Sequence, residues 1–225
     1  MKVDYVMKLG GSLLYDMQKT RIMLQRIDAS KNHNTVYTIG SGYLGEVYKQ
    51  WVMQENGVEM PFDNSIMTWS NIQSINANIL AGINSNFVVC SDLAQVDEAL
   101  QNGKRPVLDA RGFHKHFEQE EYANQTTDVR SAIMCHVLGC KQLIIVTDVD
   151  GIYSSDPKKD SNTQRIKRIN ASELRKMGRT SVDKGLADKL IQYGITGYVV
   201  GIDSIVKEKE MSQESLEDAG TVIEH

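Results

Sequence analysis

The sequence predicts an α/β protein built on a mainly parallel sheet with helices on both faces. Strand-like and helix-like segments alternate along the chain, and this order produces parallel strands joined by helices. Several strand-like segments, such as residues 143–146, are short and wholly apolar, as expected of strands buried on both faces. Two strands run directly into glycine-rich turns. Ligands of open α/β sheets bind at the carboxyl ends of strands, so we expect the site at this edge.

The composition favours a protein that binds small molecules. A chain of 225 residues with 41% hydrophobic residues can bury one substantial core, and we expect one domain with two lobes. The formal net charge of −4 provides no basic field for a nucleic acid. No segment approaches the roughly 18 apolar residues that a membrane span requires. We therefore expect neither nucleic acid nor membrane as a partner.

The cysteines and the amino terminus both bear on the cellular compartment. Cys90, Cys135 and Cys140 form neither a CxxC pair nor a metal-finger pattern, and their odd number argues against a disulfide framework. We expect reduced, buried thiols. The first residues enter a strand-like segment, with no charged region leading into a long apolar one. These features favour a cytoplasmic protein.

The first strand is expected at residues 3–9 and leads into the turn Gly10-Gly11-Ser12. Adjacent glycines expose backbone N–H groups and the Ser12 hydroxyl adds another donor, so the turn is suited to an anion. Lys8, near the end of this strand, would then meet a phosphate. The alternative for Lys8 is a lysine that extends along the surface into solvent.

A second glycine loop follows the strand expected at residues 35–39. Gly40, Ser41 and Gly42 lead toward a helix expected at residues 46–54, and the start of a helix favours a negative group. The spacing GxGxxG is matched, but no acidic residue ends a next strand about twenty residues on, as a Rossmann dehydrogenase requires. Two strand–glycine-loop–helix units instead suggest two phosphates, or one phosphate held from two sides.

The remaining elements continue the alternation. Helices are expected at residues 17–29, 66–80, 93–102, 129–138, 171–176 and 180–193, and strands at residues 87–90, 106–108, 143–146, 166–169, 198–201 and 221–223. The helix at 66–80 is a candidate interface, and we interpret its Trp69 as core or interface packing.

The polar segment 109–124 follows a strand and differs from the rest of the chain. It contains His114, His116 and several glutamates, but it lacks the i, i+4 histidine pair around a glutamate that zinc hydrolases use. We expect no metal site made by protein side chains. The segment is interpreted as a flexible loop or lid that selects the substrate.

The stretch after the strand at 143–146 has the features of a nucleotide pocket. Small polar residues and a glycine allow a sharp turn. Tyr153 offers an aromatic face for a base, and residues 156–159 form a stiff turn with two lysines suited to phosphate oxygens. A plain polar surface loop is the alternative interpretation.

Several motifs together resemble the amino acid kinase superfamily. They are MKLGGSLLYD and IGSGYLGE in the first part of the chain, NQTTDVRSA before a helix, IIVTDVDGIYSSDPK, TSVD followed by ADKL and YVVG, and a final GTVI. The resemblance spans almost the whole chain and is nearest to members like uridylate kinase, aminomethylfuran phosphate kinase and the molybdenum storage protein. It implies a three-layer αβα sandwich, in which residues 1–138 bind the phosphate acceptor and residues 139–225 bind ATP.

The resemblance also implies roles for individual residues. Lys8 would stabilise the transferred phosphoryl group, and Asp128 would orient the catalytic lysines. Lys184 matches a second catalytic lysine, with Lys189 as a competing register. The phosphate and acceptor residues would be Gly10, Gly11, Ser12, Gly40, Ser41, Gly42 and Thr127, and the nucleotide residues would be Thr147, Asp148, Gly151, Tyr153, Asp156 and Lys158. ATP and Mg²⁺ are the implied cofactors, since phosphoryl transfer depends on positioning and positive charge.

Two features depart from the usual pattern of the superfamily. Ser41 stands where most members have a third glycine, and the segment 109–124 replaces a compact turn with a longer, histidine-bearing one. The motif TSVD at 180–183 and the lack of a C-terminal regulatory domain favour the uridylate-kinase-like group over the aspartate kinases.

Two hypotheses follow for the function. The leading one is an ATP-dependent kinase that phosphorylates a small acceptor which already carries a phosphate, such as UMP or an alkyl phosphate. The alternative is a non-catalytic nucleotide-binding or molybdate/tungstate storage protein on the same fold, with His114 and His116 lining a cage or interface. The resemblance further implies a homo-oligomer.

Overall fold

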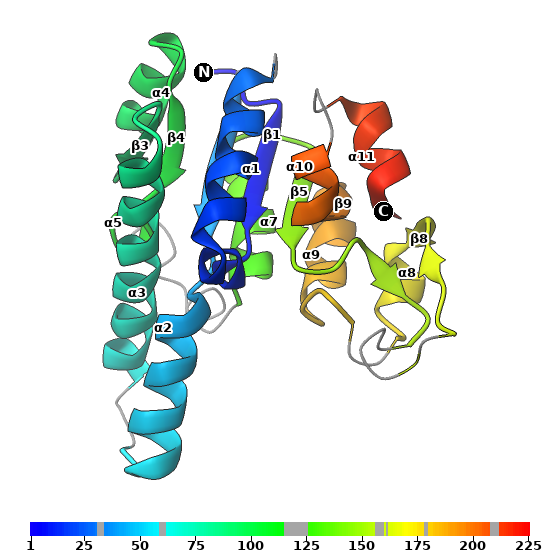
Figure 1. The fold of residues 1–225 in the computed structure, drawn as a ribbon, viewed down its shortest axis with the longest axis horizontal. Coiled ribbons are helices and arrows are strands. Elements are labelled where there is room, and N and C mark those ends of the chain that lie inside the picture. The colour runs from blue at the N-terminus through cyan, green and yellow to red at the C-terminus, as the bar shows by residue number, and fades with distance from the viewer. Residues whose placement is uncertain are drawn as a thin grey trace.

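A mixed sheet of eight strands runs through the described part of the molecule (Figure 1). The structure is a computed structural model, and it describes residues 1–30, 34–58, 62–114, 126–155, 160, 162–177, 180–207 and 212–225. In spatial order the strands are β3 (Phe87–Cys90), β4 (Arg105–Leu108), β2 (Thr35–Ile39), β1 (Tyr5–Leu9), β5 (Gln142–Thr147), β9 (Thr196–Gly201), β10 (Gly220–Glu224) and β8 (Arg168–Asn170).

The pairing of the strands brings distant parts of the chain to one edge. Within the described sheet, β9 and β10 are antiparallel and the other neighbouring pairs are parallel. Val6 of β1 pairs with Val36 of β2 on one side and with Leu143 of β5 on the other. The carboxyl ends of β2, β1, β5 and β9 therefore lie next to one another, and the prediction of a mainly parallel sheet is confirmed.

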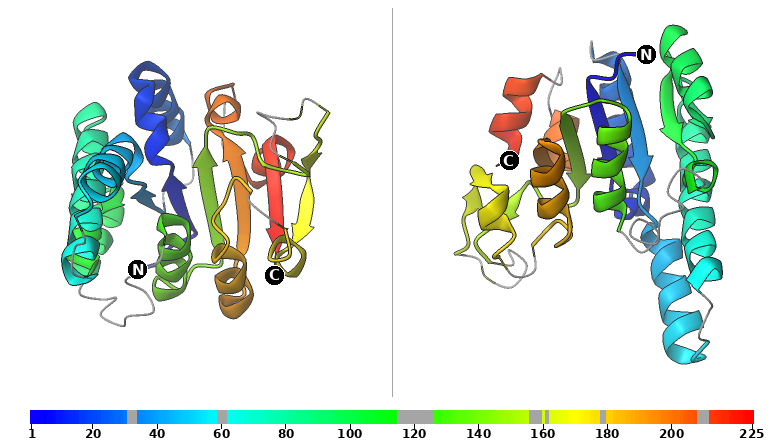
Figure 2. Two further views of the ribbon diagram at one scale, coloured as in Figure 1. Left: turned by 90° about the horizontal axis from the view of Figure 1, so that it is seen from below. Right: turned by 180° about the vertical axis from the view of Figure 1, so that it is seen from behind.

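Helices cover both faces of the sheet, and the left view of Figure 2 shows them above and below it. Buried side chains on one face come from α4 (Leu93–Gln101), α7 (Thr127–Val137), α8 (Ala171–Leu174) and α9 (Leu186–Tyr193). Those on the other face come from α1 (Met17–Ala29), α3 (Phe62–Ile83), α10 (Ile202–Lys207) and α11 (Gln213–Ala219). This is the predicted three-layer αβα sandwich.

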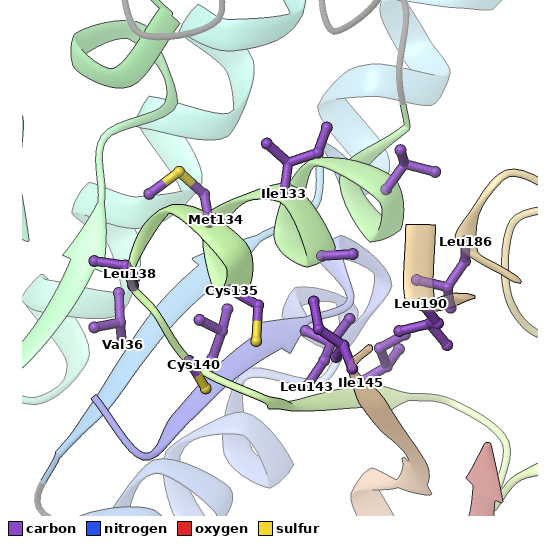
Figure 3. Packing of buried hydrophobic residues seen from close by; sticks show 14 of the residues in the cluster. Val36, Ile133, Met134, Cys135, Leu138, Cys140, Leu143, Ile145, Leu186 and Leu190 are labelled. Carbon is purple, nitrogen blue, oxygen red and sulfur yellow. The ribbon is translucent and has the colours of Figure 1, made fainter. Parts of the chain in front are cut away.

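The packing of α7 shows how the first face is closed. Ile133 and Cys135 of α7 lie in one apolar cluster with Leu143 of β5 and with Leu186 and Leu190 of α9 (Figure 3). All three cysteines are free and buried, as predicted. Because α7 packs on the sheet and beside α9, its first turn is held at the edge where the glycine loops lie.

A pair of long helices extends beyond the sheet (Figure 1). The helix α2 (Gly42–Val47) continues into the π-helix η2 (Tyr48–Glu55), which lies beside α3. The two approach closely at Gly45, where a Cβ atom would lie 2.8 Å from the Trp69 ring. Tyr48 packs edge-on against the same ring, with centroids 5.2 Å apart. Trp69 is thus a packing residue between the helices.

Some elements differ from those predicted. The helix expected at 180–193 begins only at Leu186, because the hydroxyl of Ser181 and the amide of Asp183 bond to Gly151 and Asp128 in other segments. The strand expected at 166–169 is split between β7 (Arg165–Ile166), which pairs with β6 (Ile152–Tyr153), and β8. The start of the segment 109–124 is a short helix, α5 (Ala110–His114); its remainder, including His116, lies outside the described residues.

Three helices that the sequence did not predict are all short. The 3₁₀ helix η1 (Gly11–Tyr15) follows β1, and α10 and α11 precede the last strand. These helices have five to seven residues, which is too short for a clear helical period. Within the described ranges, the helices lack the combination of length and apolarity needed to cross a membrane.

Candidate active site

The two glycine turns pack directly against each other at the ends of β1 and β2. A Cβ atom on Gly11 would lie 2.2 Å from the amide nitrogen of Gly42, and one on Gly40 would lie 2.8 Å from the amide nitrogen of Gly11. Gly42 also has φ +53°, a conformation that other residues rarely adopt. The glycines are therefore required for close backbone contact, whatever else the turns bind.

Hydrogen bonds decide which amides of these turns can serve a ligand. The amide of Gly10 donates to the Val146 carbonyl at 2.8 Å, and the amide of Gly40 donates to the Leu9 carbonyl at 2.9 Å. These two glycines extend the sheet and shape the cradle. An anion would be held by other donors of the turns.

The second turn is fixed by a residue that was not predicted from the sequence. The side chain of Asn76, buried in α3, donates to the carbonyls of Gly40 and Ser41 at 2.8 and 2.9 Å. Ser70, Gln73 and Ser74 are also buried in this helix. Polar residues at this spacing in a largely apolar helix are the signal that could have revealed a polar contact surface.

A buried ion pair lies beside the turns. The Lys8 ammonium is 2.8 Å from Asp128 Oδ1, and the side chains are 13% and 5% exposed. Asp128 lies in the first turn of α7, so this contact joins the end of β1 to the start of a helix far along the chain. The placement agrees with a lysine held for chemistry and excludes one that extends freely into solvent.

Asp183 completes this group, and it was not predicted as a site residue. Its backbone amide donates to Asp128 Oδ2 at 3.1 Å. Burial and the neighbouring charge of Asp128 raise the pKa of the Asp183 carboxyl. The two carboxyls thus share one cationic neighbour, Lys8, and the protonated form of Asp183 is favoured relative to a carboxyl in water.

A cavity of about 600 Å³ opens in front of Lys8 and the glycine turns. It is lined by Lys8, Gly11, Gly40, Ser41, Gly42, Glu46, Lys49, Ser65, Ile66, Trp69, Gln73, Thr126, Thr127, Arg130 and Asp183. Predicted site residues Lys8, Gly11, Gly40, Ser41, Gly42 and Thr127 are therefore brought together here, whereas Gly10 and Ser12 are not part of the lining. The size suits a small organic molecule.

The polar face of α7 is held in place by hydrogen bonds to two neighbours. Gln73 of α3 donates to the Thr127 hydroxyl at 2.7 Å. The hydroxyls of Ser131 and Thr38 of β2 are 2.7 Å apart, and Ser131 also donates to the Thr127 carbonyl. These contacts fix the direction of the first turn of α7.

A second hollow, of about 370 Å³, lies at the carboxyl ends of β5 and β9. It is lined by Asp148, Val149, Asp150, Tyr153, Gly201, Asp203, Ser204 and Lys207. Two predicted nucleotide residues, Asp148 and Tyr153, line it, and Thr147 donates to Asp148 at 3.1 Å. Asp156 and Lys158 lie outside the described residues.

The turn after β5 is braced by side chains and by one glycine. The Tyr153 hydroxyl donates to Asp150 at 2.5 Å, and this bond raises the pKa of the phenol. Arg165 lies 3.2 Å from the same carboxylate. Gly151 has φ +146°, and a Cβ atom there would lie 2.6 Å from the Thr221 hydroxyl. Gly151 thus shapes the turn instead of facing the hollow.

The two candidate lysines lie in different surroundings. Lys184 is exposed in the turn that precedes α9, next to Asp183 of the cavity lining. Lys189 is buried in the middle of α9, donates to Gln192 at 3.0 Å and lies 5.8 Å from the centre of the Tyr193 ring. Of the two, Lys184 is therefore the lysine that stands next to a residue of the cavity lining.

Comparison with known proteins decides the family. The family model described as "Amino acid kinase family" matches residues 5–211. The chain belongs to the amino acid kinase family. It is 29% identical to a uridylate kinase of Thermococcus kodakarensis over 217 residues, which covers 87% of this chain and 89% of that protein. Over 202 residues it is 23% identical to the beta subunit of the molybdenum storage protein of Azotobacter vinelandii, covering 84% and 71% of the two chains.

Solved structures of amino acid kinases agree on the fold. The uridylate kinase of Archaeoglobus fulgidus superposes with a TM-score of 0.74 at 21% identity, and the match covers 98% of this chain and 100% of that one. The chain is thus a kinase of the amino acid kinase family with a fold like that of uridylate kinases. Among its described residues, no three His, Cys, Asp or Glu side chains are grouped as metal ligands.

Proposed function

We propose that this kinase transfers the γ-phosphoryl group of ATP to a small acceptor which already carries a phosphate, such as UMP or an alkyl phosphate. One observation carries the proposal: the buried Lys8–Asp128 pair stands at the end of β1, between the cavity beside β2 and the hollow at β5 and β9. A cation at this point can meet a phosphoryl group that moves between the two. The similarity to uridylate kinases supports the same class of acceptor.

Lys8 would act by charge and position. The Lys8 ammonium has three N–H donors, and the ion pair with Asp128 at 2.8 Å keeps this group near the end of β1. The remaining donors can stabilise negative charge on the transferred group, which is the main need of phosphoryl transfer. The contact between Gly11 and Gly42 keeps side chains out of this space, so the phosphates can approach the backbone.

A phosphate acceptor also explains the acid–base character of the site. An oxygen of a phosphate group is anionic at neutral pH and attacks without losing a proton. A general base is therefore not required, in contrast to transfer to an alcohol. Asp183, whose pKa burial and the Asp128 charge raise, would then be a neighbour of the Lys8–Asp128 pair that the reaction does not require as a proton acceptor.

ATP would occupy the hollow at β5 and β9, where Tyr153 and Lys207 could face the base and the phosphates. In this assignment residues 1–138 hold the acceptor and residues 139–225 hold the nucleotide. Mg²⁺ supplies charge neutralisation on the β- and γ-phosphates when it is bound. It commonly keeps several waters and binds mainly to the phosphates.

The test is ADP release from Mg·ATP with a panel of acceptors: UMP, CMP, isopentenyl phosphate, an aminomethylfuran phosphate, glutamate and aspartate. We expect strong turnover with one phosphate-bearing acceptor and none with glutamate or aspartate. Uridine serves as the control for UMP, because it has the same base and sugar without the anion.

The opposite outcome would identify the alternative. ATP binding without ADP release across the panel, together with retention of molybdate or tungstate, would replace the kinase proposal with a storage function on this fold. Turnover with an amino acid would retain the kinase and reject the phosphate-bearing acceptor.

A further inference from the structure

Arg130 is a cation of the acceptor cavity to which neither the motifs nor the comparisons assign a role. It lies on α7, two residues after Asp128, and its side chain lines the cavity together with Thr127. Residues three apart in a helix share one face, so Thr127 and Arg130 face the same direction. The bond from Gln73 to Thr127 shows that this direction is toward α3, across the cavity.

The environment of Arg130 favours an anionic ligand. Burial lowers the pKa of its guanidinium, which means that the charge is poorly solvated where it stands. An arginine keeps its charge in proteins and has five N–H donors, so Arg130 can bind an anion in the cavity in addition to its contacts within the protein. The other cations of the lining are Lys8, which pairs with Asp128, and Lys49, which is exposed on η2.

Thr127 adds a donor on the same helix face. Its hydroxyl oxygen accepts a hydrogen bond from Gln73, which leaves the hydroxyl hydrogen to be donated elsewhere. Trp69 and Ile66 of α3 add apolar surface to the lining, suited to the organic part of a ligand. The cavity thus offers donors for an anion and apolar surface for an organic group.

We propose that Arg130, assisted by Thr127, binds the phosphate that the acceptor already carries and so determines the specificity for phosphate-bearing acceptors. The inference rests on the proposed function, since it concerns the acceptor of that reaction. It assigns separate cations to separate tasks: Lys8 meets the group being transferred, and Arg130 holds the acceptor's own phosphate.

The proposal is tested by calorimetric titration of the full chain, without ATP, with four probes: UMP, methyl phosphate, inorganic phosphate and uridine. The variants are Arg130→Ala, Arg130→Lys and, as a control for the loss of an arginine, Arg175→Ala, whose side chain pairs with Asp188 on the exposed surface. We expect Arg130→Ala to weaken the binding of the phosphate probes by roughly 10- to 100-fold, the range for a lost charged hydrogen bond. The affinity of Arg130→Lys for the phosphate probes should lie between those of the wild type and Arg130→Ala, because a lysine keeps the charge but lacks the bidentate geometry.

Three results would overturn the inference: wild-type affinity of Arg130→Ala for the phosphate probes, an equal loss of uridine binding, or no binding of any phosphate probe by the wild type. A second measurement separates binding from chemistry. With an acceptor that turns over, Arg130→Ala should raise KM for the acceptor while kcat changes little. If the probes bind through Arg130 but no ADP is ever released, the proposed kinase activity fails and the anion site stands. If ADP is released and the KM of Arg130→Ala equals that of the wild type, the kinase activity stands and the role of Arg130 fails.

Discussion

The part of the strand-end edge beside β1 and β2, here called the acceptor edge after its proposed role, differs in construction from the part beside β5 and β9, called the nucleotide edge. At the acceptor edge, the backbones of Gly11 and Gly42 touch and a buried ion pair lies beside them. At the nucleotide edge, the turn after β5 is braced by side chains, such as Tyr153 and Arg165 on Asp150, and the hollow is smaller. One edge depends on backbone contact, and the other on partly exposed hydrogen bonds.

This difference indicates which groups of the site must be held in precise positions. Backbone contacts have no rotamers, so the groups beside Lys8 are held within a narrow range of positions, as transfer between two phosphates requires. Side-chain contacts around a nucleotide tolerate adjustment, because each contributes only a small net free energy. Substitutions at the two edges should therefore differ in both kind and size.

The largest effect is expected for Lys8→Ala. Loss of the cation should reduce kcat for ADP release by at least roughly 100-fold, as for other groups that stabilise transition-state charge. It also leaves Asp128 buried without its partner, which costs about 3–5 kcal/mol of unfolding free energy. Steady-state kinetics and urea unfolding measure the two effects.

The double variant Lys8→Ala/Asp128→Ala separates stability from catalysis. Removing both charges should restore much of the unfolding free energy without restoring turnover. Near-normal turnover by either variant would exclude Lys8 from the mechanism. Substitutions at the acceptor edge would then affect turnover no more than those at the nucleotide edge.

The next effect concerns the contact between the glycine turns. Gly11→Ala should destabilise the fold by about 1–3 kcal/mol, because the new methyl group would overlap the backbone of Gly42. Gly82→Ala is the matched control: no atom lies within 4 Å of its Cβ position, and we expect a gain of about 0.5 kcal/mol from helix propensity. Thermal unfolding followed by circular dichroism would show whether the two changes have opposite signs.

A smaller, pH-dependent effect is expected for Asp183→Asn. The pKa of Asp183 is raised above its ordinary value of 3.8, so the folded state binds its proton more tightly than the unfolded state. The wild type therefore loses stability as the pH rises through the folded-state pKa. Asparagine cannot ionise, so the variant should be the more stable protein at neutral pH, and this advantage should shrink toward pH 4.

Denaturant unfolding at several pH values checks this expectation. A difference in unfolding free energy that does not change with pH would mean that repulsion between Asp183 and Asp128 is negligible.

The smallest effect is expected at the nucleotide edge. Tyr153→Phe removes one hydrogen bond to Asp150, which is worth about 0.5–1.5 kcal/mol. We expect KM for ATP to change less than roughly tenfold and kcat to remain close to that of the wild type. A loss of kcat as large as that of Lys8→Ala would abolish the distinction between the two edges.

The sequence predicted those parts of the site that are contiguous in the chain. Lys8 lies near the end of a strand and the two glycine turns follow strands directly, and the rule that carboxyl ends of parallel strands share an edge brings them together. Asp128 was predicted because its motif resembles that of the amino acid kinase superfamily. The strands β1 and β5 were recognisable from their apolar residues, although the register in which they pair came only from the structure.

Other parts depend on which helix face meets which strand, and a single sequence does not specify this. Asn76 acts through its place on α3 opposite the second glycine turn, and Asp183 acts through its backbone amide, which no residue type reveals. Arg130 was not predicted, because its place in the cavity lining depends on the rotation of α7 about its axis. Helices as short as α10 and α11 carry too few turns to show a period.

The position of β10 has a consequence for the order of folding. This strand is inserted between β9 and β8, and Thr221 within it joins the amide of Ile152 to the carbonyl of Ile166. The β5–β9 side of the sheet thus stays open until β10 has been synthesised. The parallel strands β3, β4, β2 and β1 are all encoded before residue 109, so they can pair earlier in synthesis. We therefore expect nascent chains to acquire a protected acceptor half before a protected nucleotide half.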